Sequence, residues 1–480
     1  MTRFLPFSSE MSMEERVRLL NGLLLKHTAH WQAITGTPVE VPEPKTVTLI
    51  VVFFIYHLAK FGAILFLTHS IFLNRRIMQV LVQKYGGTSV GTLERIAGVA
   101  LHIKSSYEKT RYKLVIVVSA MGTFTDELVQ MGLGLHPSPP KREFDMLLSA
   151  GERISASLLS IALHRVGVSS ISLTGSQSGI LTDEVHGNAR ITKILGNRIR
   201  DELSTHDVVI IAGFQGVSPL TKDVTTLGRG GSDLTAVALA IALESKGCEI
   251  YTDVPGVMSA DPRVVANANT ISHLSWELMS DLAIAGAGVV HYRAALVAQK
   301  FNMPFEIRYS QNPEITGTKI EGHKMESPQV IAVTSKSDQA HIRFSYSSEK
   351  IAGHLLTQGL QWLWKNEQAP TLYRSFHEKD VGVETVIDSS FANSFLEYQE
   401  TLAKEHHSAL QSKTVDANLA ILTVVGVGFR HAPEIVRRVL SCFEVMPRIF
   451  EIKDHAIVLS VAPDQEQIYL NKLHNLFFNT

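Results

Sequence analysis

The chain has 480 residues, more than one hydrophobic core usually supports, so two or three domains are expected. Lys and Arg number 45 and Asp and Glu 46, and a formal net charge of -1 gives no long-range field to attract nucleic acid. The two cysteines, Cys248 and Cys442, lack metal-binding spacing, which argues against a disulfide framework or a zinc cluster and favours reduced thiols in a cytoplasmic protein.

Residues 1–77 form an N-terminal extension of unusual composition. Its segment 47–73 is nearly all apolar and long enough to span a bilayer, but Lys60 lies at its centre, where a charge costs roughly 2.5–3.5 kcal/mol. Three interpretations fit this pattern. The protein starts at Met78, directly before a strand-like run; or residues 47–73 anchor it in a membrane; or the segment forms a buried helical hairpin.

From Met78 to about residue 322, short β-branched runs alternate with helical patterns. The strand-like runs are residues 80–82, 113–118, 168–173, 208–212, 249–252 and 305–309. This alternation predicts an α/β domain over residues 78–322, with a parallel sheet covered by helices. Because ligands of such sheets bind beyond the carboxyl ends of the strands, the loops that leave these ends are the candidate functional segments.

The loop after the first strand has the composition of a phosphate-binding turn. Gly86 and Gly87 follow Lys84 and Tyr85, and a helical pattern starts near Thr92. Two adjacent glycines let backbone N–H groups approach phosphate oxygens, the helix N-terminus adds partial positive charge, and the lysine adds a full one. The GxxxxGK[ST] signature of a Walker A loop is absent, so an ordinary turn is the alternative interpretation.

Two further segments carry polar groups that suit a small substrate. Thr125 follows the second strand in a loop rich in hydroxyls, which would bind a carboxylate or cap the next helix. Glu152 lies in the helical pattern 149–153. There it would accept from a cationic group of a ligand or pair with a neighbouring arginine.

The segment 225–233 gives the strongest local signal in the chain. Three glycines surround Arg229 at the entrance of an apolar helical run. Glycine loses more backbone entropy on folding than any other residue, so this concentration favours a close approach of the backbone to a ligand. Arg229 would hold a carboxylate or phosphate through two parallel bonds, and Asp233 would contact an ammonium group or complement the helix dipole.

Together, these segments resemble the aspartate kinases of the amino-acid kinase family. The resemblance rests on motifs in the same order: KYGGTSV at 84–90, SAMGTFTDEL at 119–128, FDMLLSAGERIS at 144–155, TGSQSGILT at 174–182, HGNARI at 186–191, GFQGV at 213–217, TTLGRGGSDLTAVALA at 225–240 and SADPR at 259–263. Such a series is far more specific than any single glycine loop.

The resemblance implies transfer of the γ-phosphoryl group of ATP to the β-carboxylate of L-aspartate, which gives 4-phospho-L-aspartate. This reaction is the first step toward lysine, threonine, methionine and diaminopimelate. The expected cofactors are ATP and Mg²⁺, with Mg²⁺ bridging phosphate oxygens and no dedicated set of metal-ligating side chains. A carboxylate acceptor is ionised at about pH 7, so catalysis needs cations and backbone donors rather than a histidine base.

The resemblance also implies roles for individual residues. The catalytic residues are expected to be Lys84, Arg229 and Asp233. Aspartate is expected to contact Thr125, Glu152, Arg229, Ser232 and Asp233, with Arg229 on its α-carboxylate. The nucleotide is expected to contact Lys84, Tyr85, Gly86, Gly87, Arg229, Gly230, Gly231, Ser232, Thr252, Asp253, Met258, Asp261, Arg263, Gly288 and Val289.

Two residues depart from the family pattern and leave alternatives open. Pro255 replaces the aspartate of the family's VDGV turn, and Gly288 replaces the lysine of its GAKVLH pattern. Loss of that lysine removes a positive charge from the phosphate neighbourhood, unless Arg293 substitutes for it. The alternatives are a catalytically weak, effector-binding regulatory subunit and a related amino-acid kinase with another carboxylate or carbamate acceptor.

Residues 323–480 have shorter patterns and predict a smaller α+β region. A β-α-β-β-α unit is predicted from residues 418–426, 432–442, 448–452, 456–461 and 465–477. A less clear first copy covers about 341–387. The polar run 398–413 predicts a solvated helical connector. The region resembles a pair of ACT-type regulatory domains, which implies a homodimer that binds an end-product amino acid, lysine or threonine. A degenerate dimerisation module is the alternative.

Overall fold

The computed structural model describes residues 79–322, 327–346, 349–366, 368–377, 381–408 and 410–479. The predicted extension over residues 1–77, with its apolar segment 47–73, lies outside the described residues, so its three interpretations stay as hypotheses. Residues 79–480 belong to one compact unit.

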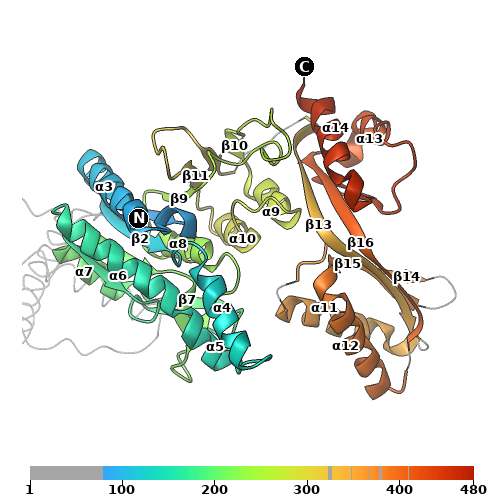
Figure 1. Ribbon diagram of the computed structural model, residues 1–480, viewed down its shortest axis with the longest axis horizontal. Helices are drawn as coiled ribbons and strands as arrows, with labels where there is room; N and C mark the ends of the chain where they lie inside the picture. Colours follow the sequence, from blue (N-terminus) through green and yellow to red (C-terminus); the bar gives the residue numbers. More distant parts are fainter. Residues whose placement is uncertain are drawn as a thin grey trace, which may run out of the picture. The chain divides into compact units, whose positions relative to one another are not determined.

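An eight-stranded sheet is the centre of the N-terminal part of this unit (Figure 1), with the order β10-β12-β11-β9-β1-β2-β6-β3. Its strands are β1 (Val80–Tyr85), β2 (Lys113–Val118), β3 (Ser170–Leu173), β6 (Val208–Ala212), β9 (Cys248–Thr252), β10 (His273–Leu274), β11 (Phe305–Tyr309) and β12 (Thr318–Ile320). All neighbours are parallel except β11 and β12. The predicted parallel α/β sheet is therefore confirmed.

Hydrophobic cores lie on both faces of this sheet because strand side chains alternate between the faces. In β2, Val115 and Val117 pack on one face, and Leu114 and Ile116 on the other. The first face is covered by α7 (Asn197–Thr205), α8 (Gly231–Ala242), α9 (Trp276–Ile284) and α10 (Tyr292–Lys300), and the second by α3 (Leu93–Thr110) and α6 (Ala150–Arg165). The sheet is thus buried on both sides, as its near-continuous apolar strands require.

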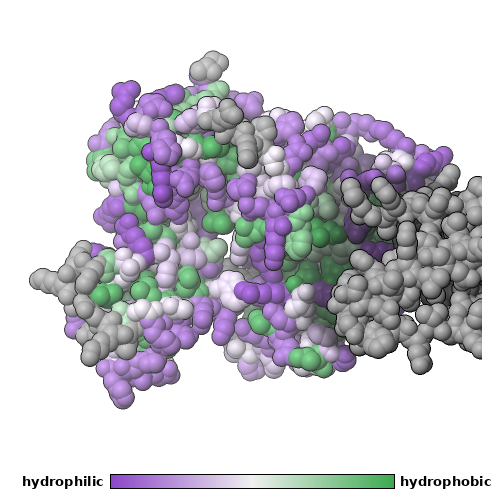
Figure 2. Space-filling model, turned by 180° about the vertical axis from the view of Figure 1, so that it is seen from behind, coloured by the Kyte–Doolittle hydropathy of each residue, from purple (hydrophilic) through white to green (hydrophobic). Residues whose placement is uncertain are grey.

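Among the described residues, one helical stretch, Lys141–Arg165, has the length and hydropathy needed to cross a bilayer. It consists of α5 (Lys141–Leu148) followed by α6. The apolar side of α6 packs in the second core, through Ala156, Leu159 and Leu163. This burial accounts for its hydropathy without a membrane. On the face shown in Figure 2, hydrophobic and hydrophilic residues are interspersed, as on most globular surfaces.

A second, four-stranded sheet has the order β5-β4-β7-β8 and was not expected from the sequence. Its strands are β4 (Ile180–Thr182), β5 (Ile191–Ile194), β7 (Gln215–Val217) and β8 (Val224–Thr226). Strands of three or four residues are too short to establish an alternating pattern. This sheet brings the segments before and after β6 together, since the hydroxyls of Thr182 and Thr225 lie 2.6 Å apart.

The C-terminal part is built on a six-stranded antiparallel sheet with the order β14-β15-β13-β16-β18-β17. Its elements in chain order are β13 (Gln329–Tyr346), α11 (Glu349–Lys365), β14 (Leu372–His377), β15 (Val381–Asp388), α12 (Ala392–Glu405), β16 (Leu410–Val427), α13 (Pro433–Leu440), β17 (Phe450–Ile452), β18 (Ala456–Val461) and α14 (Glu466–Phe478). This order repeats β-α-β-β-α twice, so the smaller α+β region is confirmed.

The structure differs from the sequence prediction in the length of the two central strands. β13 and β16 each contain 18 residues and pair with each other, which joins the two copies into one sheet. The predicted helical connector 398–413 is wrong in its second half, because α12 ends at Glu405 and β16 begins at Leu410. Residues 410–418 form a part of β16 that is largely exposed on both faces, and a count of polar residues alone does not distinguish such a strand from a solvated helix.

Candidate functional site

Four loops meet at the carboxyl edge of the parallel sheet. The register pairs Tyr85 at the end of β1 with Val118 of β2 and with Tyr251 of β9. Backbone hydrogen bonds then tie the loops together: Gly86 N donates to Tyr251 O over 3.2 Å, and Gly122 N donates to Gly87 O over 3.0 Å. The sequence-predicted phosphate turn therefore lies between the loops that follow β2 and β9.

Lys84 and Asp233 form an ion pair at the centre of this edge. The distance from Lys84 Nζ to Asp233 Oδ1 is 2.6 Å, and the two side chains are 11% and 9% exposed. Lys84 comes from β1 and Asp233 from the first turn of α8. Because a side-chain β-carbon added at Gly86 would lie 3.5 Å from Lys84 Nζ, the ammonium also sits directly beside the glycine turn. Two predicted catalytic residues are thus brought together.

The glycines of the first loop are required by close backbone approaches. A β-carbon at Gly87 would lie 2.8 Å from Ala120 O, inside the normal contact distance. The side chain of Tyr85, a predicted nucleotide contact, points the other way: it is buried in the core and stacks on Tyr251 with ring centroids 4.8 Å apart. Burial raises the pKa of Tyr85 well above its ordinary value. Tyr85 can therefore face a ligand only through its backbone.

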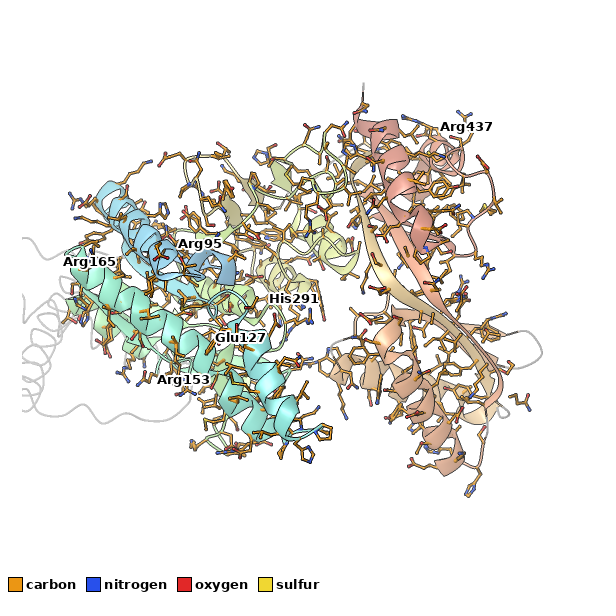
Figure 3. The ribbon with its side chains drawn as sticks, in the orientation of Figure 1. Arg95, Glu127, Arg153, Arg165, His291 and Arg437 are labelled. Carbon is orange, nitrogen blue, oxygen red and sulfur yellow. The ribbon has the colours of Figure 1, made fainter. Side chains whose placement is uncertain are left out.

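The loop around Arg229 enters α8 through a glycine that no other residue can replace without strain. Gly230 has φ +67°, and a β-carbon there would lie 2.0 Å from the β-carbon of His291. His291, labelled in Figure 3, is the residue before α10, and its backbone N–H donates to Asp233 Oδ2 over 3.3 Å. Arg229 is exposed, whereas Ser232 and Asp233 are buried in the first turn.

Ser232 is also placed beside the end of β6. A β-carbon added at Gly213, directly after β6, would lie 2.9 Å from Ser232 Oγ. Gly213 N in turn donates to Val118 O over 3.1 Å. The serine hydroxyl therefore faces the same sheet edge as the Lys84–Asp233 pair.

Glu152 supplies a buried carboxylate near this edge. It lies in the first turn of α6, is 3% exposed, and accepts a hydrogen bond from Ala120 N over 3.1 Å through Oε1. Its other oxygen, Oε2, has no hydrogen-bond partner among the described residues. Burial raises the pKa of Glu152 to about 7. An unpaired buried carboxylate oxygen suits a cationic ligand group such as an ammonium.

Thr125 is less firmly tied to the site. It is the second residue of α4 (Phe124–Leu135) and is half-buried. α4 follows the loop that contains Ala120, so Thr125 lies on the same loop-to-helix segment as the partner of Glu152. No hydrogen bond joins its side chain to another described residue.

A cavity of about 540 Å³ lies beside the loop after β9. The predicted nucleotide contacts that line it are Thr252, Asp253, Met258, Asp261, Arg263, Gly288 and Val289. Asp261 and Arg263 form an exposed ion pair, with Arg263 Nη2 2.7 Å from Asp261 Oδ2. The opposite wall is formed by Ala332, Val333, Thr334 and Ser335 of β13. This wall was not predicted, because β13 belongs to the C-terminal sheet.

Gly288 has room for a larger side chain. A β-carbon added there would meet no atom within 4 Å. Arg293 does not fill this space, contrary to the expectation that it substitutes for the missing lysine. Its guanidinium donates to Asn188 Oδ1 over 2.8 Å, to Ala189 O over 2.9 Å and to Leu227 O. Arg293 instead holds the 186–191 motif against the loop before α8.

Asp145 connects three of the quoted motifs, and its role was not recognised from the sequence. It is 1% exposed, accepts from Thr226 Oγ1 over 2.5 Å and from Gly187 N over 3.1 Å, and lies 2.6 Å from His186 Nδ1. A buried carboxylate with several donors fixes the relative positions of the segments that supply them. The motif FDMLLSAGERIS contains Asp145, but nothing in the motif indicated its partners.

No group of three or more His, Cys, Asp or Glu side chains suited to hold a metal occurs in the described ranges. The residues present fit a nucleotide better than a resident metal: a buried lysine, two glycines at a helix entrance and a carboxylate already paired with the lysine. Any Mg²⁺ here would be held mainly by phosphate oxygens and water.

Comparisons with known proteins bear on the family and the fold of the chain. The model of the amino acid kinase family matches residues 79–309. An aspartokinase from Geobacillus stearothermophilus is 40% identical over 381 residues, which cover 77% of this chain and 88% of the relative. In fold, the chain is similar to E. coli aspartokinase III in complex with aspartate and ADP (TM-score 0.71, 22% identity, 83% of this chain and 100% of that one). The complex of that enzyme with lysine and aspartate gives a TM-score of 0.63 at 22% identity, over 83% of this chain and 99% of that one.

Proposed function

The chain belongs to the aspartokinase family, and we propose that it transfers the γ-phosphoryl group of ATP to the β-carboxylate of L-aspartate. The observation that carries this proposal is the buried Lys84–Asp233 ion pair at the edge where Glu152 presents an unpaired carboxylate oxygen. Lys84 suits the phosphates of a donor, and the unpaired oxygen of Glu152 suits the ammonium group of an amino acid.

In the proposed reaction, an oxygen of the β-carboxylate forms a bond to the γ-phosphorus while the bond from that phosphorus to the β,γ-bridging oxygen breaks. The products are 4-phospho-L-aspartate and ADP, and no proton has to be removed from the acceptor. Lys84 and the N–H groups of the Gly86–Gly87 turn stabilise charge on the transferred group. Mg²⁺ bound to the phosphates would neutralise further negative charge.

The remaining predicted residues hold the acceptor in line. Glu152 would bind the α-ammonium group and Arg229 the α-carboxylate, with Ser232 and Thr125 donating to the carboxylates. Holding two anions at reacting distance is the main cost of this chemistry, so the positioning groups are expected to contribute much of the rate. Gly230 and Gly231 would let the backbone approach the nucleotide from the α8 side.

The acceptor is tested by ADP release from the full chain over a panel of carboxylates. L-aspartate is expected to support turnover, and three other acceptors are expected to support little. L-glutamate places its side-chain carboxylate one methylene further from the α-groups, N-acetylglutamate has no α-ammonium group, and carbamate has neither α-group. Turnover with one of these other acceptors but not with aspartate would contradict the proposed substrate.

A second candidate function is a catalytically weak regulatory subunit. The open space at Gly288 favours it, because a positive charge expected near the nucleotide is absent from that position. Binding of ATP with a rate of transfer no higher than background would support this candidate.

We further propose that the two β-α-β-β-α copies bind lysine or threonine and that the chain forms a homodimer. The repeated topology supports this assignment, and the lysine complex of the E. coli enzyme has the same fold. Lysine and threonine should each be titrated against aspartate-dependent activity. Loss of activity with one of them, at a concentration that leaves the other without effect, would identify the effector.

A chain that begins at Met78 is expected to retain the aspartate kinase activity of the full chain, because the described site is built entirely from residues after Gln79. We propose a cytoplasmic enzyme, because Cys248 and Cys442 are both free thiols, as expected in a reducing compartment. The measurement is kcat/KM for aspartate of both chains in detergent-free buffer. A loss of activity in the shortened chain of more than about tenfold, equivalent to 1.4 kcal/mol, would assign residues 1–77 a part in catalysis or folding.

A further inference from the structure

Lys336 is a partly buried cation that the proposed reaction does not use. It lies in β13, where its side chain is only partly accessible. Within the described parts of the chain, its ammonium forms no hydrogen bond or ion pair. Burial lowers the pKa of Lys336, and the negative charge of Asp388 acts in the opposite direction. A desolvated ammonium without a contacting anion is costly unless a ligand supplies one.

The side chain of Lys336 lines a second cavity of about 540 Å³. This cavity is bounded by Arg229 and Asp233 from the α8 entrance, by the turn of Gly286 and Gly288, and by β13. The turn at Gly286 packs closely against β13. Gly286 has φ +112°, and a β-carbon added there would lie 2.7 Å from Ser335 O and 3.5 Å from the β-carbon of Lys336. Lys336 therefore faces the site that the α/β sheet forms.

The charges around this cavity favour an anionic ligand. Asp233 is already neutralised by Lys84, at 2.6 Å. Asp388, the other acidic residue in the wall, accepts hydrogen bonds from Ser390 N over 2.9 Å and from Ser390 Oγ over 2.6 Å. Lys336 and Arg229 are the cations of the same wall. Both carboxylates of the wall therefore have donors of their own, whereas Lys336 has no contacting anion among the described residues.

This second cavity adjoins the one beside the β9 loop. Gly286, Ala287 and Gly288 line both cavities. A ligand that occupies the first cavity through its base and sugar can therefore extend its phosphates past Gly288, where no atom would obstruct a β-carbon. The phosphates would then enter the cavity that Lys336 lines. Lys84 itself lines neither cavity, but it pairs with Asp233 in the wall of the second one.

The strand around Lys336 is shaped to hold the side chain in place. A register shift between Lys336 and Gln339 marks a β-bulge, and Asp338 has φ +52°. The bulge is fixed by hydrogen bonds from Ser337 Oγ to both carboxylate oxygens of Glu466, at 3.0 and 2.8 Å, and from Gln339 Nε2 to Ser337 O, at 2.9 Å. Bulges beside functional sites commonly aim a side chain that a regular strand would turn away.

We propose that Lys336, from the C-terminal sheet, binds the phosphate oxygens of the nucleotide and supplies the positive charge that is missing at Gly288. That the ligand is a nucleotide rests on the proposed function. The cationic cavity is observed independently of that function. Lys336 is thus a substrate-binding residue contributed to the α/β site by the region expected to be regulatory.

The test is direct titration of the full chain with MgATP, MgADP and L-aspartate by calorimetry. Lys336→Met is expected to weaken ATP binding at least about tenfold, the scale of one charge-assisted hydrogen bond, and to leave the affinity for aspartate within about twofold. Lys336→Arg should keep ATP affinity within about threefold, because it retains the charge. Lys413→Met is the matched control: it removes an exposed lysine of β16, paired with Glu400 over 2.7 Å, from the same sheet.

The decisive variant combines Lys336→Met with Gly288→Lys. A lysine at 288 enters the same two cavities from the opposite wall, so the double variant should recover most of the lost ATP affinity. Unchanged ATP binding in Lys336→Met would overturn the proposal, and so would weakened aspartate binding with intact ATP binding. Binding is measured without turnover, so the two proposals can fail separately. If the chain did not phosphorylate aspartate but still bound ATP through Lys336, the proposed function would be rejected and this inference would stand.

Discussion

Replacing Lys84 with methionine is expected to lower kcat/KM for aspartate phosphorylation by about 10²–10³-fold, the usual effect of removing one group that stabilises transition-state charge. Lys84 Nζ lies directly beside the Gly86 turn, whereas Arg95 contacts the same loop further on, through Thr88 O. The effect should fall mainly on kcat, because charge on the transferred phosphoryl group develops in the transition state. Steady-state kinetics with aspartate and ATP varied separately give the measurement.

The same substitution leaves Asp233 buried without its partner, which costs about 3–5 kcal/mol in similar pairs. A loss of activity through unfolding must therefore be separated from a loss of catalysis. The double variant Lys84→Met/Asp233→Asn removes both charges and should restore the thermal midpoint while activity stays low. Lys109→Met, on the exposed side of α3, is the neutral control. If the double variant regained activity with stability, Lys84 would be structural only.

Glu152→Gln is expected to raise the dissociation constant for L-aspartate by about 10–100-fold at pH 8, because the amide keeps the shape of the side chain but loses the charge that binds an ammonium. ATP binding should be unaffected. Calorimetric titration of both ligands gives the measurement, and Glu108→Gln, an exposed acidic position on α3, is the matched control.

The pH dependence of the wild type gives the sharper test of Glu152. Its pKa of about 7 in the folded protein exceeds the ordinary value of 4.5. In the unliganded protein this carboxyl stabilises the fold fully below about pH 4.5, and that contribution is lost as pH rises toward 7, by roughly 3 kcal/mol at most. An ammonium ligand binds the ionised form, so aspartate affinity should increase up to about tenfold per pH unit below about pH 7 and then level off. A pH profile that Glu152→Gln leaves intact would contradict this assignment.

The α/β region could be predicted from the sequence because its strands are buried on both faces and read as short apolar runs separated by helical patterns. The loop after the first strand and the glycine-rich entrance to α8 point to Lys84 and Asp233. The residues around Glu152 leave its role open, and only the resemblance to aspartate kinases assigns it to the acceptor. The short strands β4, β5, β7 and β8 were missed, since three or four residues do not establish a period. Their alignment depends on tertiary contacts such as that between Thr182 and Thr225.

Lys336 and Asp145 show what local patterns cannot reveal. Asp145 lies within a helical pattern, and its partners His186, Gly187 and Thr226 are 41 to 81 residues away. Lys336 lies in the polar middle of β13, where a bulge interrupts the alternation and only the later half, 341–346, reads as a strand. The close approach of Gly286 to Lys336 depends on how two sheets pack together. The composition and spacing of a single segment do not predict that packing.

One wall of the cavity beside the β9 loop comes from Ala332–Ser335, at the start of a strand that runs on through the centre of the C-terminal sheet. The α/β half is therefore not a separable module, because a chain cut after β12 would lack one wall of the proposed donor pocket. The shared strand offers a physical route for coupling between the two sheets, and any such coupling is reciprocal. If an amino acid bound to the C-terminal sheet shifts β13 and changes affinity for ATP by some factor, ATP must change the affinity for that amino acid by the same factor.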